Sequence, residues 1–147
     1  MIPDITDFSG LDKYVKNPSL KFREAIHQYY KEMGGRLGYT VRENPSVIVK
    51  GVNYGKMDMV WVEPKITFSI EFGNLDEIYK HLWKILEFSP NVAVLILSSK
   101  SACKAEDVVK IIEKSDIMGD KRDRFLVIDI SEKKAVREPS PLQPRPC

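Results

Sequence analysis

The chain has 147 residues, of which 43% are hydrophobic and 30% are charged, and its formal net charge is +2. These values are typical of one soluble globular domain with its own core. The small positive charge permits nucleic-acid binding without arguing for it, because a convincing signal would be clustered. No apolar stretch approaches the roughly 18 residues of a membrane-spanning helix, so a membrane protein is excluded. Cys103 and Cys147 form no disulfide framework, and we expect a cytoplasmic protein.

We expect a single domain over residues 1–136, in which residues 1–19 form a loosely attached leader. Residues 137–147 contain four prolines and predict a disordered tail. Apolar residues at helical spacing predict a helix over residues 20–33, with Ser19 as its N-cap and a weakened end at Gly34-Gly35. Short strands follow at 39–42 and 47–49, and a glycine-flanked turn at 51–55.

Two further strands are predicted at 57–62 and 66–72, because β-branched and aromatic residues favour a pleated surface. An amphipathic helix follows, and the rest of the chain alternates between apolar strands and helices. These later elements are a helix at 75–88, a strand at 92–97, a helix at 104–114, a charged loop at 118–124 and a strand at 125–130. This order predicts an α/β fold, with a mixed sheet and helices on both sides.

Each of the two strands at 57–62 and 66–72 contains one carboxylate, Asp58 in the first and Glu71 in the second. If the strands pair as a hairpin, the two acids lie side by side at its open end. Adjacent carboxylates repel each other, and burial makes this worse unless a cation or a proton intervenes. The sequence therefore predicts a site that binds a cation, with a structural pair with Lys56 or a solvated surface pair as the alternatives.

The stretches KMDMVWV and FSIEFG, followed by an amphipathic helix and the VAVLIL strand, resemble the PD-(D/E)XK phosphodiesterase superfamily. In look they are nearest to archaeal Holliday-junction resolvases. The resemblance covers roughly residues 20–100 and implies a restriction-endonuclease-like α-β-β-β-α-β core, here with an extra α-β unit. It implies that Asp58, Glu71 and the Phe72 carbonyl hold Mg²⁺ or Mn²⁺. DNA is the implied partner, and nucleases of this fold often form homodimers to cut two strands.

The sequence departs from the family motif at Gly73, where the pattern has a lysine. Lys56 is the candidate replacement, because it shares a strand face with Asp58, although a solvated neighbour is the alternative. Lys80 and Lys84 are predicted to lie on the wrong face of their helix. Glu24 is the nearest match to a glutamate that family members often have on the first helix, but helical phase indicates a surface position.

Other reactive or aromatic residues have simpler interpretations. His27 and His81 lie off the apolar stripes, which favours surface positions over metal ligation. Trp61 is predicted in the core, and Trp83 in the core or at an interface. Cys103 precedes a helix, but no Cys-His pattern supports a nucleophile.

Three functions follow from these observations. The first is a magnesium-dependent DNA endonuclease with Asp58, Glu71 and Lys56 as catalytic residues. The second is a nuclease fold that has lost catalysis and serves as a nucleic-acid-binding or assembly subunit, which the glycine at position 73 favours. The third is a small α/β module whose exposed hydrophobic residues, such as Trp83, bind a protein partner.

Overall fold

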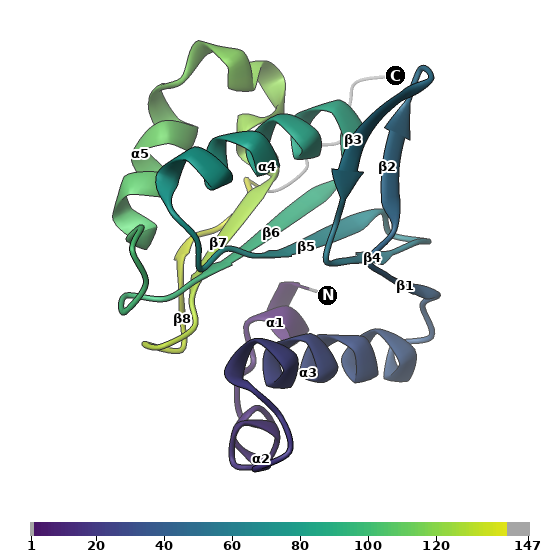
Figure 1. Ribbon diagram of the computed structural model, residues 1–147, viewed down its shortest axis with the longest axis vertical. Coiled ribbons are helices and arrows are strands. Elements are labelled where there is room, and N and C mark those ends of the chain that lie inside the picture. The colour runs from purple at the N-terminus through teal and green to yellow at the C-terminus, as the bar shows by residue number, and fades with distance from the viewer. Residues whose placement is uncertain (1, 141–147) are drawn as a thin grey trace.

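The computed structural model describes residues 2–140, and within them helices cover both faces of a mixed β-sheet (Figure 1). The strand order in this sheet is β1-β4-β5-β6-β7-β8. The strands are β1 (Val41–Glu43), β4 (Met59–Trp61), β5 (Ile66–Ile70), β6 (Val92–Leu97), β7 (Phe125–Asp129) and β8 (Lys134–Arg137). β5, β6 and β7 are parallel, and the other neighbours pair antiparallel. The predicted α/β class with a mixed central sheet between helices is therefore confirmed.

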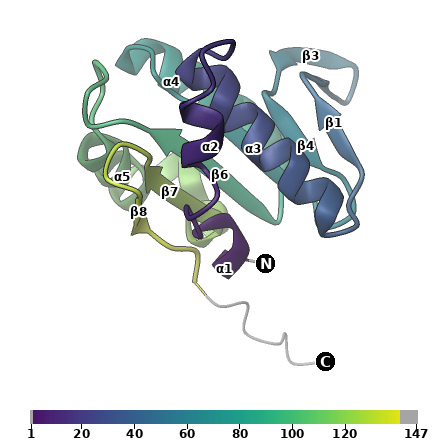
Figure 2. The ribbon, with the colours of Figure 1, turned by 90° about the horizontal axis from the view of Figure 1, so that it is seen from below.

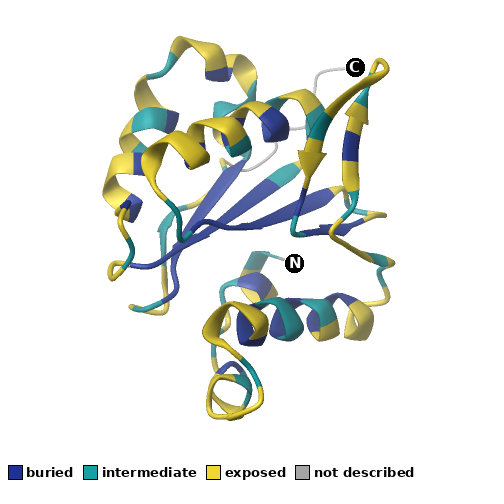
Figure 3. Ribbon diagram, viewed as in Figure 1, coloured by how far each residue is buried: buried dark blue, intermediate teal, exposed yellow. Residues whose placement is uncertain are grey.

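The helices form two layers. On one face lie α1 (Ile2–Ile5), α2 (Asp12–Val15) and α3 (Phe22–Arg36), and on the other α4 (Leu75–Phe88) and α5 (Ala105–Lys114) (Figures 1 and 2). The sequence of the central strand β6 is continuously apolar because helices cover it on both faces. Val94 and Ile96 face α3, whereas Ala93 and Leu95 face α4 and α5. Figure 3 shows the buried strands between the two layers.

Helix α3 continues through Gly34-Gly35 to Arg36, although we expected these glycines to end or weaken it. Gly34 lies against the sheet, where a Cβ would be 2.5 Å from Nε1 of Trp61 and 2.7 Å from Cγ2 of Val41. The glycine therefore allows the helix to approach the sheet closely, and this packing outweighs its low helix propensity.

Most of the predicted turn at 51–55 is instead a strand, and only Gly51 lies in a turn. β2 (Ser46–Val49) and β3 (Val52–Lys56) form a separate two-stranded sheet beside α4 (Figure 1). Lys50 and Gly51 connect them, both with positive φ, as a two-residue type I′ hairpin turn requires.

The two ends of the domain also differ from the prediction. Ile5 and Leu11 are fully buried, and Tyr30 donates a hydrogen bond to the Ile5 carbonyl at 2.8 Å, so the leader is part of the core. The predicted loop at 118–124 lies in a 3₁₀ helix, η1 (Asp116–Arg124). Arg137, the first residue of the predicted tail, ends β8 and donates to the Phe125 carbonyl at 2.8 Å. Residues 141–147 of that tail lie outside the described residues.

Candidate functional site

Asp58 and Glu71 lie at the edge of the sheet where β4 begins and β5 ends. The two strands pair antiparallel, with Met59 opposite Phe68, so the residue before β4 lies beside the end of β5. The Oδ2 atom of Asp58 accepts a hydrogen bond from the Ile70 N–H at 2.7 Å. Because Ile70 directly precedes Glu71, the hairpin places Asp58 and Glu71 at the same end of the two strands.

The guanidinium of Arg23, which comes from the α3 layer, reaches Asp58. Arg23, in the first turn of α3, donates through Nη2 to Oδ1 of Asp58 at 2.7 Å and through Nη1 to the Ile70 carbonyl at 2.8 Å. The Arg23 side chain is 49% exposed and that of Asp58 is 24% exposed. Arg23 therefore bridges the start of β4 and the end of β5 from a position open to solvent.

Glu71 is almost completely buried, at 3% exposure, and contacts α4. The Nδ1 atom of His81 lies 2.6 Å from Oε2 and 2.8 Å from Oε1 of this carboxylate. The main chain of Glu71 is also fixed, because its N–H donates to the Ile96 carbonyl of β6 at 2.8 Å. His81 was predicted at the surface, and it is partly exposed, but its ring holds a buried acid.

Lys84 is also part of this cluster, so the prediction that it lies on the wrong face of α4 is wrong. Its side chain is buried, and Nζ donates to the main-chain carbonyl of Lys56. Burial lowers the pKa of Lys84, and the nearby charges of Glu71 and Asp58 oppose that shift. Helical phase could not predict this position, because the contact is with the β2–β3 sheet, which packs against α4 and was not predicted.

The other predicted site residues contribute less to the cluster. The side chain of Lys56 is exposed, and its recorded contact with the cluster is made by its carbonyl group. Lys80 and Glu24 are exposed, and the residue of α3 that reaches the acids is Arg23. Phe72 is partly buried, and its ring stacks on the ring of Phe22. A role for the Lys56 ammonium stays a prediction.

Together these contacts resolve the repulsion that the two neighbouring carboxylates would suffer. Arg23 and Lys84 supply two positive charges for the two negative charges of Asp58 and Glu71, and His81 adds a hydrogen bond. The sequence offered a weak signal for His81 and Lys84, which are three residues apart on one helix. It offered none for Arg23, because that contact joins residues 35 positions apart.

The donor chemistry of the site fits a hard divalent cation, since two carboxylates and the Phe72 carbonyl are oxygen ligands. The Arg23 guanidinium now holds Oδ1 of Asp58, so a cation that uses this atom must displace it. Among the described residues, no three His, Cys, Asp or Glu side chains are already grouped as a metal site. Cys103 is buried, and burial raises the pKa of its thiol, which does not favour a nucleophile.

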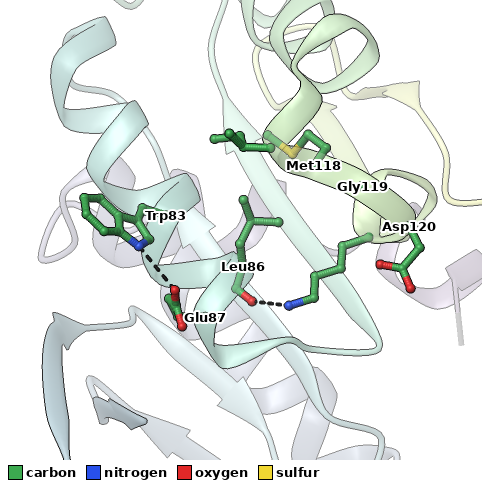
Figure 4. Close-up of a pocket in the computed structure, with 8 residues that line it drawn as sticks. Trp83, Leu86, Glu87, Met118, Gly119 and Asp120 are labelled. Carbon is green, nitrogen blue, oxygen red and sulfur yellow. Dashed lines mark hydrogen bonds between the residues drawn. The ribbon is translucent and has the colours of Figure 1, made fainter. Parts of the chain in front are cut away.

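A separate groove of about 540 Å³ lies between α4 and η1 (Figure 4). Trp83 and Ile117, which are 62% and 72% exposed, line it together with Leu86 and Met118. Lys121 also lines the groove and donates to the Leu86 carbonyl at 2.6 Å. The groove contains neither Asp58 nor Glu71. Binding of a protein partner through Trp83 stays a prediction.

None of the helices in residues 2–140 combines the length and the apolar character needed to cross a membrane. Comparison of the chain with protein-family models, with curated proteins and with solved structures found no match.

Proposed function

We propose that the chain is a divalent-metal-dependent DNA endonuclease with a restriction-endonuclease-like fold. The observation that carries the proposal is the buried lysine Lys84 within electrostatic reach of both Asp58 and Glu71. The order of elements supports it. Apart from the β2–β3 sheet, which is inserted between β1 and β4, the chain runs through α3, the antiparallel strands β1, β4 and β5, then α4 and the parallel strand β6. This is the α-β-β-β-α-β order that the sequence predicts.

In this proposal Lys84 takes the role of the lysine that is missing at position 73. A Cβ added to Gly73 would lie 2.1 Å from Oε2 of Glu77, so any side chain there must displace Glu77. Lys84 instead approaches the acids from the next helix. Its side chain is buried, and Nζ donates to the Lys56 carbonyl at the end of β3. A fixed ammonium beside the acids can stabilise the charge that develops on a phosphate during hydrolysis.

Asp58, Glu71 and the Phe72 carbonyl would hold Mg²⁺ or Mn²⁺. When bound, such an ion supplies activation of a water molecule and neutralisation of charge on the phosphate. Glu71 is well suited to this role, because its main chain is anchored to β6 and its side chain is oriented by His81. Asp58 becomes available once the partly exposed Arg23 leaves it.

The test is cleavage of supercoiled, linear and branched DNA with Mg²⁺ or Mn²⁺. We expect the wild type to cut, and Asp58→Asn, Glu71→Gln and Lys84→Met each to lose at least roughly 100-fold in rate. Lys80→Met is the matched control, since it removes an exposed lysine from the same helix and should leave the rate unchanged. A folded wild type that cuts no substrate with either metal would contradict the proposal.

A second candidate is a nuclease fold that binds nucleic acid without cutting it. The ion pair between Arg23 and Asp58 favours this alternative, because it occupies one of the oxygens that a metal would need. It predicts DNA binding that is retained in Asp58→Asn and Glu71→Gln, together with no cleavage by any variant. The cleavage assay and a binding assay therefore separate the two functions.

A further inference from the structure

We propose that Phe22 stacks on an unpaired base, so that the substrate of the site is single-stranded nucleic acid or a single-stranded part of a branched molecule. This inference rests on the proposed function and names the substrate class of the same site. It starts from the position of one aromatic ring beside the charged cluster.

Phe22 is the first residue of α3, and its neighbour in sequence is Arg23, which contacts Asp58. Phe22 is 41% exposed, although its side chain is large and apolar. It lies parallel to the ring of Phe72, with an interplanar angle of 4° and a centroid separation of 5.9 Å. Phe72 directly follows Glu71. The two stacked rings are therefore next in sequence to Arg23, which contacts Asp58, and to Glu71.

Positive charges flank the exposed ring. Lys21 precedes Phe22 and is exposed, and its side chain makes no cap hydrogen bond at the start of α3. Arg23 follows it, with a side chain that is 49% exposed. Lys21, Phe22 and Arg23 thus form a cation-aromatic-cation sequence next to the site. Proteins that bind single strands combine these two features, because cations contact the phosphates while aromatic rings stack on the bases.

The aromatic ring accounts for a preference between single and double strands. Bases within a duplex are paired and already stacked on each other, so one of them reaches Phe22 only after it leaves the stack, which costs free energy. An unpaired base stacks on the ring without that cost. Loss of one base-aromatic stack typically lowers affinity roughly 5- to 150-fold, and we expect this loss for single strands alone.

The experiment measures binding of a labelled single-stranded oligonucleotide and of its blunt duplex by fluorescence anisotropy, in EDTA and again with Ca²⁺. The variants are Phe22→Ala, Phe22→Leu and Phe22→Trp. Leucine keeps an apolar side chain against Phe72 but removes the aromatic face, whereas tryptophan keeps the aromatic face. The matched control is Val15→Ala, which shortens another apolar side chain of similar exposure, 39%.

We expect Phe22→Ala and Phe22→Leu to bind the single strand at least about fivefold more weakly and to bind the duplex as the wild type does. Phe22→Trp and Val15→Ala should bind both as the wild type does. Equal losses for both ligands, or no loss in Phe22→Leu, would overturn the inference. A wild type that binds and cuts duplex but not single strands would overturn it while leaving the nuclease intact. A folded wild type that neither binds nor cuts nucleic acid would overturn both proposals.

Discussion

Substitution of Arg23 by methionine tests whether the guanidinium and a metal ion compete for Asp58. Methionine keeps most of the aliphatic stem of the side chain and removes the charge. In the wild type, the ion pair between Nη2 of Arg23 and Oδ1 of Asp58, 2.7 Å apart, must break before a cation can use that oxygen. The free energy of the ion pair therefore opposes metal binding, and removing Arg23 should increase metal affinity.

The size of the effect follows from the exposure of the two side chains. A short, charge-assisted hydrogen bond is among the stronger polar contacts, but the Arg23 side chain is 49% exposed and that of Asp58 is 24% exposed, so solvent weakens it. We assign the pair about 1 kcal/mol. Its removal corresponds to roughly fivefold tighter binding of Mg²⁺ or Mn²⁺.

Isothermal titration calorimetry with Mn²⁺, in the absence of nucleic acid, measures this change directly. Arg36→Met is the matched control, because Arg36 is an exposed arginine at the other end of the same helix. The two positions are separated by about 20 Å along the helix axis, which is beyond the screening length at physiological salt. Unchanged or weaker Mn²⁺ binding in Arg23→Met, or an equal gain in Arg36→Met, would refute the competition.

Three further predictions concern stability. The lowered pKa of Lys84 means that the unfolded chain binds this proton more tightly than the folded chain does. The stability of the wild type relative to Lys84→Met should therefore rise as pH increases from the folded-state pKa towards the unfolded-state pKa of about 10.4. Urea unfolding at several alkaline pH values measures this difference, and a constant difference across that range would contradict the prediction. Gly34→Ala should destabilise the fold by roughly 1–3 kcal/mol in the same assay, because the added Cβ meets Trp61. Gly35→Ala should instead stabilise it by roughly 0.5–1 kcal/mol, because no atom lies within 4 Å of the added Cβ. Equal effects of the two substitutions would argue against the close helix-sheet contact. Leu11→Ala should lower the free energy of unfolding by about 2–4 kcal/mol, since Leu11 is 1% exposed. Val15→Ala should lower it by less than about 0.5 kcal/mol, because Val15 is half-exposed. Thermal or chemical unfolding measures both, and a small loss for both would mean that the leader is not part of the core.

Elements with strong periodicity were predictable from the sequence. The helix at 75–88 and the strand at 92–97 match α4 and β6, because a long amphipathic pattern and a continuous apolar run each favour one structure. The elements that were missed depend on a partner elsewhere in the chain. β3 exists because it pairs with β2, and β8 because it pairs with β7. Local propensity does not contain that information.

The sequence by itself determined the pairing of these two strands, although both are shorter than predicted: Asp58 directly precedes β4 and Glu71 directly follows β5. The two acids therefore lie at the same end of the hairpin, since adjacent strands of a hairpin fix their own register. Only the tertiary structure decided which side chains neutralise these acids. Arg23 reaches Asp58 because α3 packs against β1 and β4. Lys84 is buried because the β2–β3 sheet packs against α4. Charge compensation at a buried site depends on distances in space, and residues far apart in sequence acquire those distances only when the layers pack together.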